Sequence, residues 1–167
     1  MSYFNRFPNV DYNFDGQIIK INNITKRVVV DDLVYTTPGA LTSYNIKNDE
    51  TPRMIAHQLY GDDRLYWVVL LLNNIYDIYQ DWPKSVFEMS TFLHNKYGDS
   101  VDSVHHYEDS SGMVVFEGSL PVDEIILVTN REYEFNINNE KSVILLLEPS
   151  FVGEFVSNFE SEISGHG

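Results

Sequence analysis

The segment that begins at Thr51 constrains the fold most, because two consecutive helices and their ends can be located in it. Thr51 and the proline after it predict a helix start. The Thr51 hydroxyl can accept a hydrogen bond from a backbone amide of the first turn, which has no partner within the helix. Proline at the first helical position has no amide hydrogen, so it leaves no such donor unpaired. Gly61 is expected to end this helix. Asp62 or Asp63 then caps a second helix over about residues 64–73, whose run WVVLLL predicts a buried helix.

Strands are expected on either side of these helices. Residues 43–47 (SYNIK) alternate polar and apolar side chains, as a half-buried strand does. The pattern YNIKNDETPRMIAHQLYGDDRLYWVVLLLNN resembles the LysM module, a βααβ unit known for binding N-acetylglucosamine polymers such as peptidoglycan. A LysM module closes with a second strand antiparallel to the first, and KSVILLLEP resembles that strand. The resemblance implies that residues 44–47 and 143–147 are strand neighbours and that about 75–141 are an insertion.

Further elements are predicted along the rest of the chain. Ser85 and Glu88 match a capping box that starts a third helix. The ranges 104–108 and 113–117 should pair as a hairpin, and 125–129 is a further strand candidate. Residues 131–141 are expected to form a polar helix, and a last helix begins near Pro149, with apolar residues repeating every three or four positions.

We therefore predict an α+β fold with a LysM-like βααβ core, a helix and β-hairpin insertion, an extended N-terminal arm and a C-terminal helix. The expected divisions are an arm with short strands over 1–42, an interrupted core over 43–149, and a helix with a frayed tail over 150–167. Within the arm, short strands are expected at Gln17–Ile21 and Arg27–Val30.

The charge balance excludes several classes of partner. The chain has 167 residues, 25 acidic and 11 basic side chains and a formal net charge of −14. Nucleic acid and anionic membrane surfaces are poor partners for it, because phosphate contacts require Lys and Arg. The apolar runs are much shorter than the ~20 residues that cross a bilayer, and no signal-peptide pattern is seen at the amino terminus. With no cysteine, disulfides and thiolate metal sites are excluded.

Candidate metal sites are weak. Residues 11–18 match the first eight positions of an EF-hand calcium loop, but Asn22 stands where the loop needs a bidentate Glu, so an Asx-type turn is the favoured interpretation. His105 and His106 are adjacent on a predicted strand and are expected to point to opposite faces. The other histidines, His57, His94 and His166, also lack ligand spacing. We predict no metal and no cofactor.

Catalytic constellations are also missing from the sequence. No GxSxG motif, cysteine nucleophile or glycine-rich phosphate loop occurs. Asp62 and Asp63 are explained as helix caps, so they do not indicate a pair of glycosidase carboxylates. We predict that the chain is not an enzyme.

Phrases spread over most of the chain carry a second resemblance. They are YFNRFP, NITKRVVV, YGDDRLYWVVLLLNN with DWP about ten residues on, HHYE, and TNREYEFNINNEKSVILLLEP. Together they resemble the baseplate wedge protein fifty-three family of contractile-tailed, T-even-like bacteriophages. The resemblance implies a structural protein of the virion tail baseplate that carries a LysM-like domain, is present in the host cytoplasm during assembly, and has other wedge and hub proteins as partners.

Two sets of site residues follow from these interpretations. The first is a set of aromatic anchors for protein interfaces, because Tyr, Trp and Phe supply large contact areas: Tyr3, Phe4, Phe7, Tyr12, Phe14, Tyr76, Tyr79, Trp82, Phe151, Phe155 and Phe159. Tyr76, Tyr79 and Trp82 are expected to be exposed, and Trp67 is expected in the core. The second set belongs to the alternative function, a carbohydrate-binding module that recognises peptidoglycan: Asn48, Asp49, Glu50, Thr51, Asn73, Asn74 and Ile75.

Overall fold

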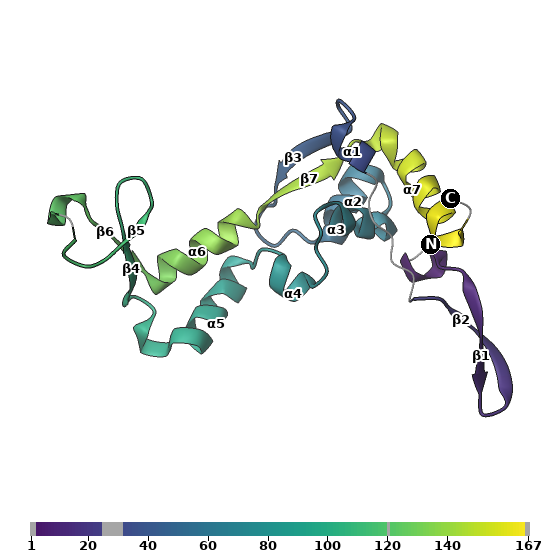
Figure 1. The fold of residues 1–167 in the computed structure, drawn as a ribbon, viewed down its shortest axis with the longest axis horizontal. Helices are drawn as coiled ribbons and strands as arrows, with labels where there is room; N and C mark the ends of the chain where they lie inside the picture. Colours follow the sequence, from purple (N-terminus) through teal and green to yellow (C-terminus); the bar gives the residue numbers. More distant parts are fainter. Residues whose placement is uncertain (1–2, 25–31, 120, 166–167) are drawn as a thin grey trace. The chain divides into compact units, whose positions relative to one another are not determined.

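The structure of the chain is a computed structural model, and it describes residues 3–24, 32–119 and 121–165. Helices and strands are mixed, as predicted for an α+β fold (Figure 1). The chain divides into two compact units. Unit 1 comprises Met1–Asn45, Glu50–Ile78 and Ile144–Gly167, and unit 2 comprises Ile46–Asp49 and Tyr79–Val143. The strand predicted at 27–30 lies outside the described residues.

Unit 1 contains both termini and two separate pairs of strands. Its elements in chain order are η1 (Tyr3–Arg6), β1 (Asn9–Phe14), β2 (Gln17–Asn22), α1 (Asp32–Thr36), β3 (Leu41–Asn45), α2 (Pro52–Tyr60), η2 (Asp63–Leu65), α3 (Tyr66–Leu72), most of β7 (Val143–Leu147) and α7 (Pro149–Ser164). β1 pairs with β2, and β3 pairs with β7.

The predicted ends of the first helix, α2, are confirmed. The Thr51 hydroxyl accepts a hydrogen bond from the Met54 amide at 3.3 Å, and Gly61 ends α2 in the left-handed conformation, with a φ of 72°. Asp62 accepts from the Arg64 amide at 2.9 Å, so it caps the short η2 turn instead of a full helix. The single helix predicted over 64–73 is therefore divided into η2 and α3.

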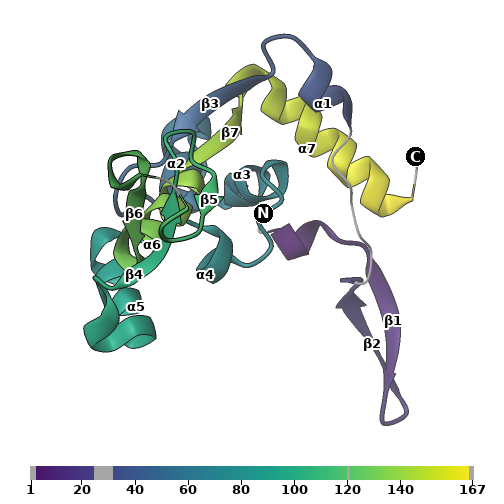
Figure 2. The same cartoon turned by 60° about the vertical axis from the view of Figure 1, so that its left-hand side comes forward.

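The predicted pairing of the strand before α2 with the strand near residue 145 is also confirmed. The Glu148 amide donates to the Ala40 carbonyl at 2.8 Å, and the Ile46 amide donates to the Ser142 carbonyl. The later residue of one strand thus pairs with the earlier residue of the other, so the two strands run antiparallel. β3 occupies residues 41–45, two residues earlier than predicted. In both ribbon views α2 and α3 lie beneath this pair of strands (Figures 1 and 2).

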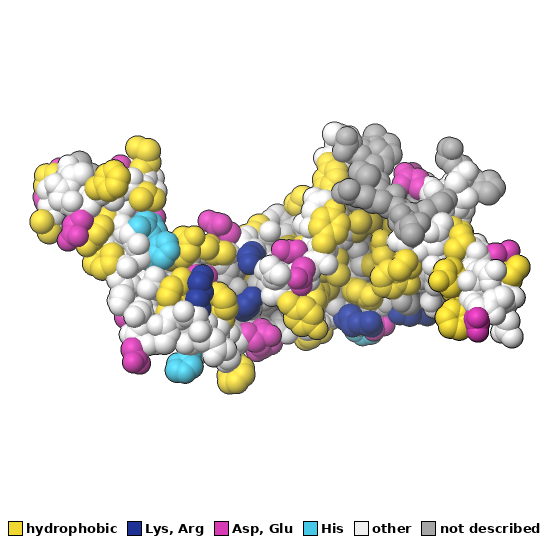
Figure 3. Space-filling model, turned by 60° about the horizontal axis from the view of Figure 1, so that its bottom comes forward, with side chains coloured by type: hydrophobic (Ala, Val, Ile, Leu, Met, Phe, Trp, Pro, Cys, Tyr) yellow, Lys and Arg dark blue, Asp and Glu magenta, His cyan; other side chains and the backbone are white. Residues whose placement is uncertain are grey.

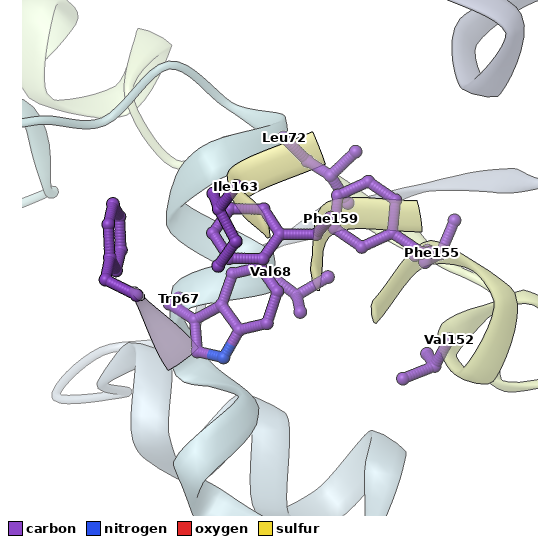
Figure 4. Packing of buried hydrophobic residues seen from close by; sticks show 9 residues of the cluster. Trp67, Val68, Leu72, Val152, Phe155, Phe159 and Ile163 are labelled. Carbon is purple, nitrogen blue, oxygen red and sulfur yellow. The ribbon is translucent and has the colours of Figure 1, made fainter. Parts of the chain in front are cut away.

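The core of unit 1 is built mainly by α3 and α7. Its buried side chains are Phe7, Trp67, Val68, Leu72, Leu147, Val152, Phe155, Phe159 and Ile163. The Phe159 ring lies 4.6 Å from that of Trp67, centroid to centroid, and the Phe155 ring lies 6.1 Å from it (Figure 4). The expected burial of Trp67 is confirmed. The apolar repeat of α7 is explained by this packing, since every buried position of that helix lies on one face.

Unit 2 combines helices with a small sheet. Its elements are most of α4 (Ile78–Asp81), α5 (Val86–Tyr97), η3 (Gly98–Ser100), β4 (Val104–Glu108), β5 (Val114–Val115), η4 (Val122–Glu124), β6 (Ile126–Thr129) and α6 (Asn130–Glu140). The capping box at Ser85 is confirmed. The three strands are antiparallel in the order β5-β4-β6, so the predicted hairpin and the third strand are both present.

A buried carboxylate joins α5 and α6 of unit 2. Glu134 of α6 is only 6% exposed and accepts hydrogen bonds from the Lys96 ammonium at 2.5 Å and from the Tyr97 hydroxyl at 2.7 Å. Burial raises the pKa of Glu134, but these two hydrogen bonds outweigh it and hold the pKa below its usual value. The paired charge therefore fixes α5 against α6.

Candidate protein-interaction site

The β1–β2 hairpin of unit 1 is formed by a two-residue turn. Asp15 and Gly16 both have positive φ, 50° and 83°, as the type I′ turn of a tight hairpin requires. Asn13 supports the turn, because its side-chain oxygen accepts a hydrogen bond from the Gly16 amide at 2.9 Å. The sequence favours an Asx-type turn here, but the structure has a type I′ hairpin turn, because the Asn13 side chain bonds the amide three residues on instead of two. Within the described residues, no group of three or more His, Asp or Glu is placed to hold a metal ion.

One face of this hairpin is apolar and open to solvent. Residues directly opposite each other in an antiparallel pair share a face, and the register pairs Val10 with Ile21 and Tyr12 with Ile19. Phe14, opposite Gln17, extends the same face to the turn. All five apolar side chains are exposed, from 38% for Val10 to 64% for Phe14. We call this set of five, Val10, Tyr12, Phe14, Ile19 and Ile21, the hairpin face.

The opposite side of the hairpin is mostly polar. It carries the pairs Asn9 with Asn22, Asp11 with Lys20, and Asn13 with Ile18. The hairpin is therefore amphipathic, like a strand pair that packs on a core, yet it stands clear of the other elements of unit 1 in both ribbon views (Figures 1 and 2). An isolated two-stranded hairpin is at best marginally stable in water, and its apolar face is suited to a partner surface.

The base of the hairpin is anchored in the core of unit 1. The Tyr3 ring lies 5.7 Å from the Trp67 ring, and the Phe7 ring lies edge-on to that of Phe159 at 6.2 Å. Arg6 pairs with Glu160 of α7 and also lies over the Trp67 ring. At the other strand, the Asn22 side-chain amide donates to the Phe4 carbonyl at 2.8 Å. These contacts hold the entry and the exit of the hairpin.

Burial divides the aromatic anchors predicted from the sequence. Phe4, Tyr12, Phe14, Tyr76 and Tyr79 are exposed, and Tyr3 and Phe151 are half-buried against the core of unit 1.

Four of the predicted anchors are buried inside the chain itself: Phe7, Trp82, Phe155 and Phe159. The prediction of an exposed Trp82 is wrong, because its side chain is only 8% exposed. The chain two residues after it is tied to α6 by two hydrogen bonds between Asn138 and the Lys84 backbone. Phe155 and Phe159 complete the core around Trp67, so these two side chains are not available to a partner.

The residues of the predicted glycan groove in unit 1 mainly make contacts within the unit. Glu50 is buried and both of its carboxylate oxygens accept from the Tyr44 hydroxyl at 2.9 Å, while Thr51 caps α2. The Asn73 side chain bonds to the Leu145 amide and carbonyl, each at 2.8 Å, and so joins the end of α3 to β7.

The remaining groove residues are distributed over both units. Asn74, which has a positive φ of 53°, and Ile75 follow Asn73 in unit 1. Asn48 and Asp49 belong to unit 2, where the Asn48 side-chain oxygen accepts from the Val86 amide at 3.0 Å.

The predicted arrangement of the adjacent histidines is wrong. A β-bulge lies between Val104 and His106, so His105 has no opposite residue on β6. The two rings come together, with their Nδ1 atoms 2.7 Å apart, and the His105 ring stacks on that of Tyr133 at 3.8 Å. The alternation of a regular strand predicts opposite faces, and only the bulge brings both imidazoles to one side.

Sequence reasoning did not predict β1, although a signal for it is present. Alternating apolar residues flank the Asp15-Gly16 pair on both sides, and Asp-Gly between such runs is a strong indicator of a hairpin. The prediction included a strand at 17–21 but treated the residues before it as an irregular arm.

The family model for base plate wedge protein 53 of bacteriophages matches residues 7–118, which include the whole hairpin. The chain belongs to the base plate wedge protein 53 family. It is also similar to baseplate wedge protein gp53 of Enterobacteria phage T4, with 43% identity over 45 residues. That match covers 27% of this chain and 23% of the T4 protein. Membership of this family gives the chain a phage baseplate setting.

None of the helices in the described part of the chain is both long enough and apolar enough to cross a membrane.

Proposed function

We propose that the chain is a structural component of a bacteriophage tail baseplate wedge, and that it joins neighbouring wedge proteins around the tail hub through protein–protein contacts. The hairpin face is proposed as one of these contacts. The observation that carries the proposal is an exposed apolar face on a hairpin whose base is fixed in the core. We further propose that the chain has no catalytic role, that it assembles in the host cytoplasm, and that it resides in the virion.

The size of the hairpin face fits an interface contact. Fully burying one large apolar side chain contributes about 1.5–3 kcal/mol. The five side chains of the hairpin face are already partly covered, so docking them would contribute on the order of 5 kcal/mol before ordering costs. The anchored base reduces those costs, because the strands are positioned before the partner arrives.

The LysM-like description stays a proposal about unit 1. Its support is the order β3, α2, α3 and β7, with β3 and β7 paired, and unit 2 would then be the insertion between α3 and β7. In the proposed function this core serves as a scaffold. Glu50, Thr51 and Asn73 make contacts that hold the scaffold together, which argues for structural roles at these positions.

The experiment that tests the hairpin face compares two neighbouring isoleucines. Ile19 lies on the hairpin face and Ile18 lies on the opposite face, and both are exposed. Ile19→Thr and Ile18→Thr therefore make the same chemical change on different sides of one strand. Each tagged variant is supplied in trans to phage whose own copy is inactivated, and purified tails are assayed for the tag. We expect Ile19→Thr to lose incorporation, while Ile18→Thr retains it.

Several results would contradict the proposal. Equal incorporation of both variants would remove the hairpin face from the interface, and absence of the unaltered chain from tails would overturn the baseplate role. Deletion of residues 1–14 is a poorer test, because it also removes Phe7 from the core. The same preparations are incubated with purified cell wall. Saturable binding that is weakened by changes in 48–51 would favour the glycan-binding alternative.

A further inference from the structure

The β4–β5–β6 sheet of unit 2 leaves large apolar side chains exposed around its end. They are Met113, Val114, Phe116, Val122, Ile126 and Leu127. Phe116 is 87% exposed and Val122 is 91% exposed, although single apolar residues of this size are usually at least partly covered in a folded chain. We call these six side chains, together with the loops that carry them, the sheet tip. None of them belongs to the hairpin face.

The six side chains do not all lie on one side of the sheet. The register pairs Glu108 with both Val114 and Ile126, which therefore share one face. Leu127 is opposite Tyr107 and lies on the other face. A flat partner surface would cover only one of these faces. A cleft that receives the end of the sheet would cover both.

The loops of the sheet tip are held by their own hydrogen bonds. A carboxylate oxygen of Asp109 accepts from the Ser111 hydroxyl at 2.6 Å, from the Met113 amide at 3.0 Å and from the Ser111 amide at 2.8 Å. These bonds hold the pKa of Asp109 below its usual value. The turn after Phe116 is closed by the Ser119 amide and hydroxyl, which both donate to the Phe116 carbonyl. Met113 and Phe116 are thus presented on turns held by hydrogen bonds, which lowers the entropy cost of binding.

The charges around the sheet tip all have one sign. Residues 104–129 contain Glu108, Asp109, Glu117, Asp123 and Glu124, and no Lys or Arg. In Figure 3 the surface over this sheet, at the left, shows hydrophobic and acidic side chains, while the Lys and Arg side chains on that face lie elsewhere. Two copies of this surface would repel each other. A partner with basic residues around an apolar centre would be attracted.

We infer that the sheet tip is a second docking surface, which inserts into an apolar cleft rimmed by Lys and Arg on a different protein. The inference rests on the exposed apolar side chains and on the charge of this sheet, and it goes beyond the hairpin contact of the proposed function. Its partner is a protein with a cationic rim, and neither a second copy of this chain nor a nucleic acid fits that description.

Site-specific photocrosslinking tests this inference. p-Benzoylphenylalanine is placed at Phe116 in the tagged full-length chain, which is expressed in cells infected with phage whose own copy is inactivated. The same group at Phe87, which is 80% exposed on α5 of the same unit, is the matched control. After irradiation the crosslinked peptide is sequenced. We expect position 116, and not 87, to crosslink to an apolar segment with neighbouring Lys or Arg in another protein.

The apolar and charged parts of the inference are tested separately. Val122→Ser should lower the crosslinked yield about tenfold, as expected for loss of an apolar anchor in a buried contact. Glu117→Gln with Glu124→Gln should lower it several-fold. When the irradiation is repeated in lysate of the infected cells, raising the salt from about 50 to about 500 mM should do the same, because the attraction is screened.

Four outcomes would overturn the inference: a crosslink to a second copy of the chain, a crosslink to an acidic or uncharged surface, a yield that does not respond to salt, or no crosslink from position 116. Tail incorporation is measured in parallel for every variant. A chain that enters tails without crosslinking at 116 refutes the sheet tip and leaves the baseplate role intact. A chain that crosslinks as expected but never enters tails refutes the baseplate role alone.

Discussion

Phe159 provides the sharpest test of how the core of unit 1 is built. Its ring is 3% exposed and lies 4.6 Å from the Trp67 ring, 5.7 Å from the Tyr3 ring and 6.2 Å from the Phe7 ring. Phe159→Ala removes the central member of this group. Replacing a buried phenylalanine by alanine costs about 3–5 kcal/mol, because both the transfer free energy and the packing around the cavity are lost. We therefore expect the free energy of unfolding of unit 1 to fall by about 4 kcal/mol.

The measurement is urea unfolding followed by tryptophan fluorescence. Trp67 lies in unit 1 and Trp82 in unit 2, so Trp82→Phe is used as the background and fluorescence then reports on unit 1. With an m-value of about 1–3 kcal/mol per molar urea, the midpoint should fall by about 2 M. Phe87→Ala, at an exposed position of unit 2, is the control and should change the midpoint little.

Three results would contradict this reasoning. A loss below about 1 kcal/mol for Phe159→Ala would mean that α7 contributes little to the core and is free to serve as the interface helix expected from sequence. A comparable loss for Phe87→Ala would mean that the assay does not isolate the core of unit 1. Normal stability of Phe159→Ala together with failed incorporation into tails would likewise mean that Phe159 lies at an interface with another protein.

Three further predictions concern polar contacts. Asn73→Ala should destabilise unit 1 by about 2 kcal/mol, because it leaves the Leu145 amide and carbonyl without the Asn73 side chain as partner. Amide hydrogen exchange at Leu145 should become faster. Unchanged exchange would contradict this role of Asn73. The folded-state pKa of Glu134 is lowered, so its contribution is present above the unfolded pKa of about 4.3 and is lost as pH falls through the folded pKa. Glu134→Gln should therefore be less stable than the unaltered chain near pH 7, with the difference shrinking in acid; a constant difference in melting temperature from pH 7 to pH 3 would refute the pairing with Lys96. Hydrogen bonds from the Arg64 side chain and backbone lower the pKa of Asp62 to about 2, so NMR titration of the Asp62 carboxyl carbon should show ionisation down to that pH. Arg64→Ala should raise the pKa of Asp62. An unmoved titration curve would show that the backbone hydrogen bond alone sets this pKa.

The ends of the helices could be predicted from sequence because they depend on nearby residues. Thr51 caps α2 through an amide three residues away, Ser85 and Glu88 form a capping box, and Gly61 takes the left-handed conformation. These interactions are complete within one turn of chain. The type I′ turn at Asp15 and Gly16 is equally local, and its hairpin could have been predicted in the same way.

Burial required the tertiary structure. The apolar repeat of α7 predicts an apolar stripe, but whether Phe155 and Phe159 pack on Trp67 or on another protein depends on residues about ninety positions away. The alternating face of the hairpin predicts burial equally well, yet Tyr12 and Phe14 are exposed in this chain. Periodicity shows that a face is apolar, while the chain's other elements decide whether that face is covered.

The site thus combines local and non-local determinants. By itself the sequence determined the α+β composition, the helix ends, the pairing of the strand before α2 with the strand near residue 145, and membership of a phage baseplate family. The tertiary structure decided which aromatic residues remain available, and it brought His105 and His106 to one side through a bulge that strand alternation does not predict. The physical reason is that hydrogen bonds at caps and turns join near neighbours, whereas hydrophobic burial joins whichever surfaces the whole chain brings together.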